Sequence, residues 1–525
     1  MLARWEKGVR SMMFDSPDVL IVGAGACGCL MAKELVGQGL SVVVLEAGKR
    51  FDPARDLQNH ESNAARILWS EPRVYSGKHG VVPKAGVGVG GGTLAWLGVM
   101  PRFHPADFRT YSTEGVGVDW PICYEDLKPY YRQVERDLGV AGECGPFAPE
   151  PYELPMPAHR MNWHAQVLAR GARKLGAQPF APPIAINSVP YGGRPACTYC
   201  GWCGSGCATD AKATGANTYL ATAEKRGVCV ISEAFVHRVN YDAGKGRVTG
   251  VAYLDALQRE HQIDARLVVL AAHAMETPRL LLLSANGTFP HGLANSSGQV
   301  GRNLMSHPTW QVFGTFDTPI NAFKGMQMGH VMVQDYYRPD PANGYARGFV
   351  LLSYMMTPIT YANLSGSFYG PEFKQFLHDY AYTAAWWAHA EGLPCEHNTV
   401  TLDPDLKDNR GLPVSRVTYE WGENDLKLAA AARDKVAEMM GASGARQVRV
   451  GLNYGAHAMG TCRMGSDRQT SVVNQFCQSH DIPNLFICDT SVFVTGSGVN
   501  PTLTAMAIAS RAAGHIANSA RRQEL

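Results

Sequence analysis

Apolar residues near the start of the chain form two short runs that flank a helical pattern. Residues 18–22 and 41–45 consist mostly of Val, Leu and Ile, which is typical of buried strands, and residues 29–36 have a helical pattern. Gly37 and Gly39 follow this stretch and predict its end. A strand, a helix and a second strand in this order predict a parallel βαβ unit.

The same alternation returns later in the chain. Residues 266–272 predict another buried strand. Residues 276–278 predict the start of the next helix, which continues over residues 279–284, with Pro278 at an early position that tolerates proline. Residues 485–487 predict a further strand. Residues 309–419 are richer in aromatic residues and polar strand-like runs, and we expect them to form a second layer. The pattern predicts an α/β fold with a doubly wound, Rossmann-like sheet.

The turn between the first strand and its helix carries Gly23, Gly25 and Gly28 in a G-x-G-x-x-G spacing. Alone, this spacing could be any glycine-rich turn. With a strand before it, a helix after it and Glu46 ending the next strand, it predicts a dinucleotide site. Gly23 permits the tight turn and Gly25 lets the backbone approach a pyrophosphate. Gly28 allows close packing, and Glu46 can bind the ribose hydroxyls.

Residues 86–93 form a second glycine-dense turn. Its backbone amides could cradle a phosphate or lie flat against a ring system, although an ordinary tight loop has the same composition.

Length and charge narrow the class of protein. The chain has 525 residues, and its hydrophobic content of 46% is enough to bury a large core. Its 48 Lys and Arg nearly balance 46 Asp and Glu, so no basic footprint for a nucleic acid is present. No apolar stretch reaches the roughly 18 residues of a membrane span. Residues 1–16 contain neither a long apolar region nor a twin arginine, so no export signal is predicted.

Four of the 13 cysteines, Cys197, Cys200, Cys203 and Cys207, lie within eleven residues. Their C-x2-C-x2-C-x3-C spacing lets several thiolates point into one small volume, which favours an iron–sulfur cluster. Structural zinc, a disulfide and free thiols remain alternatives. The other nine cysteines are scattered, and the odd total argues against a complete disulfide framework.

Three C-terminal motifs, at residues 454–464, 484–489 and 498–504, resemble the end of glucose–methanol–choline (GMC) flavoprotein oxidoreductases. The resemblance also covers the N-terminal fingerprint, the loop at 88–93 and residues 271–284. Within this family, the cysteine run and residues 191–195 resemble the large subunits of bacterial dehydrogenases that act on fructose, glucose, gluconate and related polyols or glycosides. Those enzymes carry FAD and an iron–sulfur cluster, often of the 3Fe-4S type, and pass electrons to a cytochrome c subunit.

The resemblance implies a Rossmann-like FAD-binding domain interleaved with a substrate domain on a mostly antiparallel sheet. The FAD-binding domain would comprise residues 15–120, 205–308 and 445–525. The substrate-binding domain would comprise residues 121–204 and 309–444, with the cysteine segment 197–207 at the boundary.

The resemblance also assigns roles to single residues. His457 would be the general base of alcohol oxidation, and its ordinary pKa of about 6.5 suits that task. Asn500 would orient the hydroxyl. A histidine in a structural role and an Asn-Pro turn are the alternatives at these two positions. Asp489 would bind the ribityl–pyrophosphate part of the flavin. The remaining residues expected at the cofactor are Gly88, Gly91, Gly92, Thr93, Val236, Asn500, Pro501 and Thr502.

Two departures from the family pattern modify the expected cofactors. Residues 93–96 offer no histidine to tether FAD, so we expect non-covalent FAD. Ala208 follows the last cysteine where many relatives have proline, so a three-iron and a four-iron cluster are both open. Cys197 could be a fourth ligand or could replace Cys200.

A group of aromatic and polar residues near position 390 bears on the substrate class. Trp386, Trp387, His389 and Glu391 could stack on a sugar ring and hydrogen-bond its hydroxyls, or could be core residues. We therefore expect a dehydrogenase for a sugar, glycoside or polyol. The rivals are a dehydrogenase for a non-sugar alcohol, an oxygen-using oxidase, a redox-neutral lyase and a non-enzymatic metal-binding protein. A small export subunit would place the protein in the periplasm, whereas a cytoplasmic enzyme fits the chain alone equally well.

Overall fold

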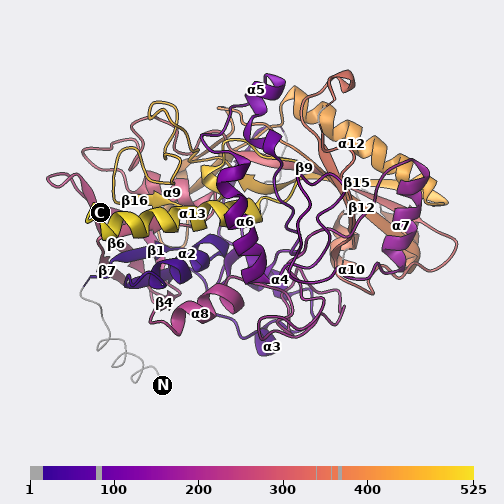
Figure 1. Cartoon of the computed structure of the whole chain (residues 1–525), viewed down its shortest axis with the longest axis horizontal. Coiled ribbons are helices and arrows are strands. Elements are labelled where there is room, and N and C mark those ends of the chain that lie inside the picture. The colour runs from indigo at the N-terminus through magenta and orange to yellow at the C-terminus, as the bar shows by residue number, and fades with distance from the viewer. Residues whose placement is uncertain (1–15, 79–84, 339, 356, 365–368, 525) are drawn as a thin grey trace.

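The computed structural model describes residues 16–78, 85–338, 340–355, 357–364 and 369–524. In Figure 1 the N-terminal βαβ unit lies on the left. Strands β9 (Met305–Thr315), β12 (Thr383–Ala390) and β15 (Gln447–Met459) lie on the right with helix α12 (Glu423–Ala442). The segment 1–16, for which no export signal was predicted, lies outside the described residues except for Ser16.

A parallel sheet of five strands forms the first side, in the order β16-β8-β1-β2-β4. The strands are β1 (Val19–Val22), β2 (Val42–Glu46), β4 (Cys229–Ser232), β8 (Leu267–Leu270) and β16 (Leu485–Ile487). The apolar residues of β1, β2, β8 and β16 are buried and those of the edge strand β4 are partly buried. Helices cover the sheet, among them α2 (Ala26–Val36), which also packs on α13 (Thr502–Arg521). The predicted doubly wound, Rossmann-like sheet is confirmed.

Helix α2 begins earlier than predicted, whereas helix α9 begins at the predicted residue. Helix α2 begins at Ala26 rather than at residue 29, because extended Gly25 is its N-cap and the helix follows the glycine turn directly. Helix α9 spans Glu276–Leu283, so it begins where predicted and ends one residue before the predicted Ser284. Pro278 lies in its first turn, where a missing N–H breaks no helical hydrogen bond.

The second side is an antiparallel sheet in the order β10-β11-β12-β9-β15. Its strands are β9 (Met305–Thr315), β10 (Met328–Val333), β11 (Phe349–Tyr354), β12 (Thr383–Ala390) and β15 (Gln447–Met459). Helix α12 (Glu423–Ala442) packs on β9, β12 and α7 (Trp163–Lys174). The predicted second, mostly antiparallel layer is therefore present.

Strand β15 affects the expected division into domains. It lies within the stretch 445–525 that was assigned to FAD binding, yet it pairs with β9 in the antiparallel sheet. The chain therefore passes from one sheet to the other between β15 and β16, and the domain boundaries themselves stay a prediction.

Two small sheets complete the strands, in the orders β13-β14-β3 and β5-β6-β7. Their strands are β3 (Val74–Ser76), β5 (Phe235–Asp242), β6 (Arg247–Leu254), β7 (Glu260–Asp264), β13 (Thr399–Lys407) and β14 (Pro413–Thr418). The remaining α-helices are α3 (Pro53–Asp56), α4 (Asn63–Ile67), α5 (Thr110–Glu114), α6 (Tyr124–Leu138), α8 (Ala221–Glu224), α10 (Pro358–Leu364) and α11 (Gly370–His378).

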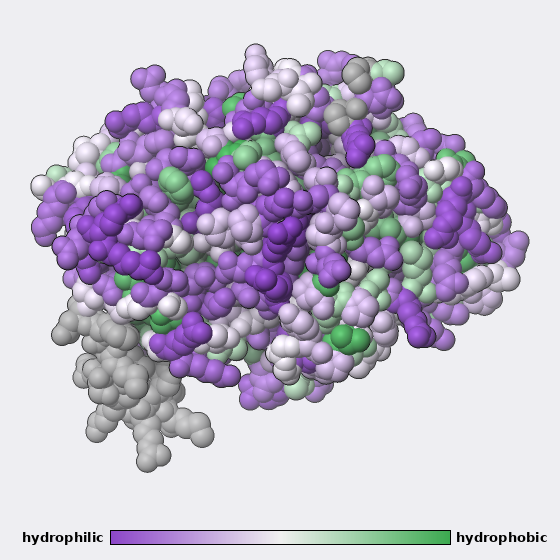
Figure 2. All heavy atoms as spheres, viewed as in Figure 1, coloured by the Kyte–Doolittle hydropathy of each residue, from purple (hydrophilic) through white to green (hydrophobic). Residues whose placement is uncertain are grey.

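The face of the molecule in Figure 2 is mainly hydrophilic, with apolar residues in small scattered groups. Among the helices of the described ranges, none combines the length and apolarity that a membrane crossing requires.

Candidate functional site

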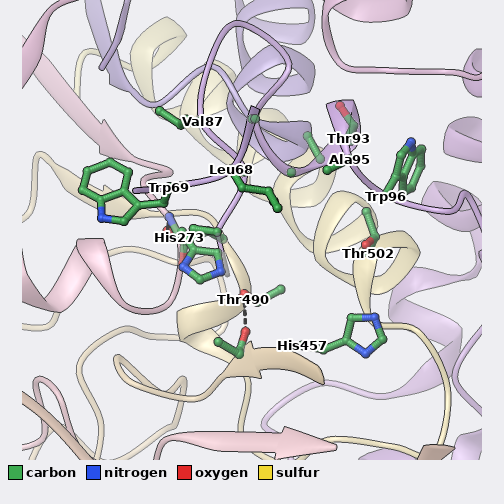
Figure 3. Close-up of a pocket in the computed structure, with 18 of the residues that line it drawn as sticks. Leu68, Trp69, Val87, Thr93, Ala95, Trp96, His273, His457, Thr490 and Thr502 are labelled. Atoms are coloured by element: carbon green, nitrogen blue, oxygen red, sulfur yellow. Dashed lines mark hydrogen bonds between the residues drawn. The ribbon is translucent and has the colours of Figure 1, made fainter. Parts of the chain in front are cut away.

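A cavity of about 600 Å³ lies between the two sheets. The glycine turn after β1 lines it at Gly23 and Gly25, and His457 and Asn500 line it from the C-terminal part of the chain. Figure 3 shows Trp69, His273, Trp96 and His457 arranged around this space. Residues far apart in the sequence thus meet at one site.

The first glycine turn has the geometry that the fingerprint predicts. Gly23 has a φ of +104°, and a Cβ there would lie 2.4 Å from the carbonyl oxygen of Ala271. A Cβ on Gly28 would lie 1.9 Å from the carbonyl oxygen of Gly23, so helix and strand pack too closely for any side chain. A Cβ on Gly25 would meet nothing within 4 Å, which leaves backbone accessible from the cavity.

Glu46 is buried and connects three backbone segments at the cavity wall. Its Oε1 accepts from the amides of Gly48 and Gly88 at 2.9 and 3.0 Å, and its Oε2 accepts from the amide of Ala24 at 2.9 Å. Burial raises the pKa of its carboxyl group, and the three amide hydrogen bonds oppose that shift. Binding of ribose by Glu46 stays a prediction.

The second glycine turn packs against the first. A Cβ on Gly91 would lie 2.6 Å from the Cα of Gly25, and Gly88 has a φ of +115°. Gly92 has open space at its Cβ position, and Thr93 accepts from the amide of Gly215 at 2.9 Å. The turn thus offers a second stretch of side-chain-free backbone to the cavity.

Most of the other predicted cofactor residues also line the cavity. They are Val236 on β5, Asp489 after β16, and Asn500, Pro501 and Thr502 at the start of α13. Gly28 and Gly88 lie behind the wall and shape it.

Asp489 has several hydrogen-bond partners within the protein. Its Oδ2 accepts from the amide of His273 at 3.0 Å and from the hydroxyl of Thr277 at 2.6 Å. Its Oδ1 accepts from the amide of Ser491 at 2.8 Å. These contacts tie the end of β16 to the start of α9, and a contact of Asp489 with the flavin stays a prediction.

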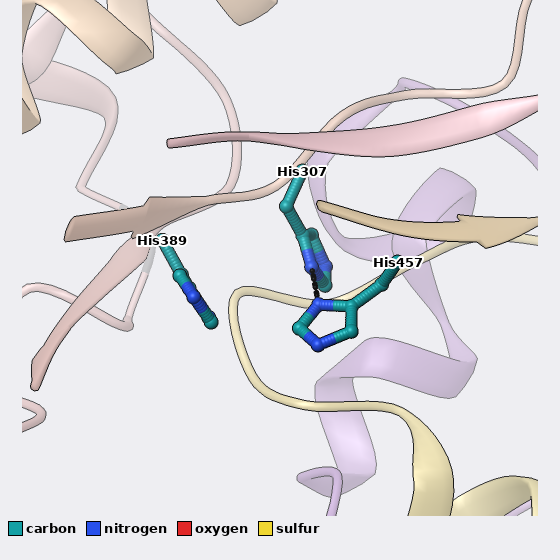
Figure 4. Close-up of side chains that lie close together, drawn as sticks. All are labelled: His307, His389 and His457. Atoms are coloured by element: carbon teal, nitrogen blue, oxygen red, sulfur yellow. Dashed lines mark hydrogen bonds between the residues drawn. The ribbon is translucent and has the colours of Figure 1, made fainter. Parts of the chain in front are cut away.

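His457 lies in a bulge of β15. The register between β15 and β9 shifts between Ala456 and Met459, and His457 has a left-handed φ of +60°. Bulges commonly re-aim a side chain next to an active site. Here the bulge directs the imidazole to the cavity, where it contacts Asn500. His307 lies beside it and is hydrogen-bonded to it (Figure 4).

Hydrogen bonds fix the tautomer of His457. The carbonyl of Ser497 accepts from Nε2 of His307, so neutral His307 presents a lone pair at Nδ1. That atom lies 2.8 Å from Nδ1 of His457, which must therefore donate. Nε2 of His457 is then the acceptor, and Nδ2 of Asn500 donates to it at 3.3 Å. The chain leaves a basic nitrogen on the cavity side of His457.

Burial keeps these imidazoles neutral. It lowers the pKa of His307 to about 4. It lowers the pKa of His457 well below the ordinary value, and the neighbouring His307 lowers it further. A neutral imidazole is the form that a general base needs.

The aromatic group predicted on β12 is divided between the two faces of that strand. Trp387 and His389 line the cavity, whereas Trp386 packs in the core on the helix side, because side chains alternate along a strand. Glu391 faces Arg347 instead, with 2.9 Å between Oε2 and Nε. The proposed sugar-binding group thus reduces to Trp387 and His389.

His389 is buried, and neither of its ring nitrogens has a hydrogen-bond partner among the described residues. His307, His389 and His457 each have one ring nitrogen that could bind a metal ion. These three nitrogens lie within 4.8 Å of one another, a spacing that a divalent ion could use. Both nitrogens of His307 are already hydrogen-bonded, however, so a base supported by a neighbour explains the set better than a metal centre does.

The four cysteines form a loop that borders the cavity. Gly204 and Ser205, directly after Cys203, line the cavity wall. All four thiols are free, so the disulfide alternative is not formed. Within the described ranges the histidines, and not the cysteines, are the group whose donor atoms converge as a single ion requires.

Sequence reasoning missed His307 and Lys212. His307 precedes Pro308 at the start of β9, and no spacing connects it to His457, 150 residues later. Lys212 follows the last cysteine by five residues, and its buried ammonium group gave no signal among the 48 Lys and Arg of the chain.

A glycine turn at the carboxyl edge of a parallel sheet, facing a neutral histidine across one cavity, defines a dinucleotide-dependent oxidoreductase. Profiles of the GMC oxidoreductase family match residues 17–309 and 394–509. The chain belongs to the GMC oxidoreductase family. It is an FAD-dependent oxidoreductase of the kind that acts on CH–OH donors.

Individual relatives cover nearly the whole chain. It is 33% identical to the fructose dehydrogenase large subunit of Gluconobacter japonicus, over 96% of this chain and 98% of that protein. It is also 33% identical to 2-methyl-1,2-propanediol dehydrogenase of Mycolicibacterium austroafricanum, over 96% and 95% of the two chains. Among solved structures, pyridoxine 4-oxidase from Mesorbium loti matches with a TM-score of 0.68 and 18% identity, over 95% and 98%, which shows the fold.

Proposed function

We propose that the protein is an FAD-dependent dehydrogenase that oxidises an alcohol carbon of a sugar, glycoside or polyol. His457 would be the base, and electrons would leave through an iron–sulfur cluster held by the cysteine loop to a cytochrome c or another acceptor. The observation that carries the proposal is the hydrogen-bond chain that leaves Nε2 of His457 basic in a cavity lined by the dinucleotide turn.

The residues at the cavity fit FAD, and bound FAD supplies the acceptor for the hydride. Gly25 and Gly92 present backbone without side chains, and the cavity continues from them to His457. Nε2 of His457 takes the hydroxyl proton as hydride leaves the carbon. Its Nδ1–H stays hydrogen-bonded to His307, which stabilises the imidazolium that forms.

Asn500 positions the hydroxyl. Its Nδ2 already donates to His457, while its buried Oδ1 has no partner among the described residues. When a substrate hydroxyl donates its proton to Nε2 of His457, Nδ2 of Asn500 can donate to the hydroxyl oxygen instead, and Oδ1 can accept from a second hydroxyl of the substrate.

Two observations favour a polyhydroxylated substrate. Trp387 offers an aromatic face beside His389, whose unpartnered nitrogens can bind a second hydroxyl. Two relatives of similar identity are dehydrogenases of fructose and of a 1,2-diol. A non-sugar alcohol is the second candidate, supported by the name of the diol enzyme.

The cysteine loop supports the electron route. Cys197, Cys200, Cys203 and Cys207 are all free, and the loop touches the cavity through Gly204 and Ser205. An iron–sulfur cluster there, with three or four irons, would supply one-electron transfer.

The electron route implies partners. A relative is itself called a large subunit, which favours a small export subunit and a cytochrome c partner for this chain. In that case the enzyme works in the periplasm, and without such a subunit it works in the cytoplasm.

The visible absorption spectrum of the anaerobically purified protein tests the proposal. We expect flavin bands on a broad iron–sulfur background, and bleaching of the flavin when a sugar or polyol substrate is added. Flavin bands without the background would refute the relay and favour an oxygen-using oxidase, which rapid oxygen consumption would then establish. An unbleached flavin with every alcohol tested would contradict the oxidation itself.

The pH dependence of flavin reduction should reflect the buried base. Because the pKa of His457 lies well below about 6.5, the base remains neutral throughout the neutral range. We expect the rate constant for flavin reduction, measured by stopped flow at saturating substrate, to be constant from about pH 6.5 to 8 and to fall only at more acidic pH. An acidic limb with an apparent pKa at or above 6.5 would contradict this assignment.

Removing the partner of the base should slow the same step. His307→Phe keeps a ring of similar size but frees His457 to take either tautomer. We expect flavin reduction to slow roughly 10- to 100-fold with little change in substrate affinity, because the lost group orients the base and binds no substrate. His164→Phe is the control, since His164 is also buried but lies on α7, away from the cavity. Equal effects of the two substitutions would show a purely structural role.

A further inference from the structure

Lys212 is a buried ammonium group beside the cysteine loop. Only 1% of the residue is exposed. Its Nζ donates to the carbonyls of Leu94 and Trp96, each at 2.9 Å, and to that of Cys203 at 2.5 Å. Three acceptors satisfy the three N–H groups of an ammonium ion. The three carbonyl oxygens therefore hold the ammonium group of Lys212 in one position.

The charge of Lys212 has no carboxylate partner. Among the described residues, no Asp or Glu forms an ion pair with it. Burial lowers the pKa of its ammonium group, and Cys203, Cys207 and Cys200 oppose that shift when they are thiolates. A buried charge without a counter-charge is costly, and backbone carbonyls compensate only part of that cost. The natural counter-charge at this position is therefore the thiolate form of the loop.

The backbone of Lys212 contacts the same loop. Its amide lies 3.4 Å from Sγ of Cys207 and donates to it. Hydrogen bonds to thiolate sulfur and nearby positive charge both stabilise negative charge on a metal cluster. The amide and the ammonium group of Lys212 thus both stabilise negative charge on the sulfurs of the cysteine loop.

Lys212 also lies between the two predicted redox sites. On one side it binds Cys203, and on the other it binds the segment of Leu94 and Trp96, which follows the second glycine turn. Trp96 lines the cavity, as does Gly204 directly after Cys203. A positive charge at this position lowers the energy of an electron that passes from the cavity to the cysteine loop.

We propose that Lys212 is the fixed counter-charge of the cysteine-bound cluster and sets its reduction potential so that it can accept electrons from the flavin. This inference rests on the proposed iron–sulfur cluster. One electron leaves the reduced flavin and enters the oxidised cluster, whose negative charge grows by one with no bond made or broken. A nearby cation stabilises the more negative state. Loss of the cation therefore lowers the reduction potential of the cluster.

The test compares Lys212→Gln with Lys212→Arg in the intact protein. Glutamine keeps N–H donors for the carbonyls but removes the charge, whereas arginine keeps the charge. The cluster potential is measured by redox titration followed by electron paramagnetic resonance. Iron and acid-labile sulfide are counted in parallel, and the flavin spectrum reports that each variant is folded.

We expect the Lys212→Gln protein to show a more negative cluster potential, or to lose iron and sulfide, with FAD still bound and still reduced by substrate. The Lys212→Arg protein should resemble the wild type in both properties. If the glutamine variant keeps the wild-type potential and iron content, Lys212 is a structural residue and the inference is wrong, while the proposed function stands. If the wild-type protein contains no iron or sulfide, the proposed electron route fails and the role of Lys212 fails with it.

If both variants fail to fold, Lys212→Met provides the second measurement, because methionine keeps a long unbranched side chain and carries no charge. The inference requires a more negative cluster potential or a loss of iron and sulfide in this protein, with FAD still bound. A wild-type potential and iron content would overturn it.

Discussion

Replacement of His457 by alanine should lower the rate constant of substrate-dependent flavin reduction by roughly 10²- to 10⁴-fold, the usual contribution of a general base. FAD should remain bound, because the glycine turns at 23–28 and 88–93 are untouched. Stopped-flow absorbance in the flavin band under anaerobic conditions measures the rate, and the static spectrum measures the bound flavin.

The matched control for this variant is His261→Ala. His261 is exposed on β7 and pairs with Asp255, and it does not line the cavity. We expect this variant to reduce its flavin at the wild-type rate. A His457→Ala protein that keeps more than about a tenth of the wild-type rate would assign the base to another group, since general-base catalysis accounts for at least 10²-fold.

Replacement of Cys203 by serine should separate the two half-reactions. Serine is a poor ligand for iron, so we expect iron and acid-labile sulfide to fall to a small fraction of the wild-type content. Substrate should still bleach the flavin, because Gly204 and Ser205 line the cavity and Cys203 does not. Turnover with cytochrome c or another one-electron acceptor should fall by at least about tenfold, since the route for single electrons is lost.

Cys395→Ser is the control for the cysteine loop. Cys395 is a free, partly buried thiol outside the loop, and its replacement should leave iron content and turnover unchanged. Full turnover of the Cys203→Ser protein with the one-electron acceptor would show that electrons pass directly from the flavin to that acceptor.

The two variants also distinguish the rival functions. An oxidase should lose activity with His457→Ala but not with Cys203→Ser. A redox-neutral lyase would show no substrate-dependent bleaching in the wild type, and a metal-binding protein without catalytic activity would be insensitive to the loss of His457.

The sequence by itself determined the features that depend on neighbours along the chain. The spacing of Gly23, Gly25 and Gly28 between a strand and a helix defines a turn whose geometry is local, and the structure has that turn. The apolar runs predicted β1, β8 and β16 within one or two residues, because a buried parallel strand reads as a continuous hydrophobic segment. The start of helix α2 was less well predicted, since Gly25 caps the helix and the helix follows the glycine turn directly.

The tertiary structure decided which side chains act together. His307 meets His457 because β9 and β15 pair in antiparallel register, with Ala456 opposite His307 and a bulge directly after it. Trp386 and Trp387 are adjacent in sequence yet lie on opposite faces, because only the sheet defines which face borders the cavity. Lys212 became a candidate once its carbonyl partners were known. Local spacing specifies turns and strands, whereas proton position and buried charge depend on contacts between residues that only the folded sheets bring together.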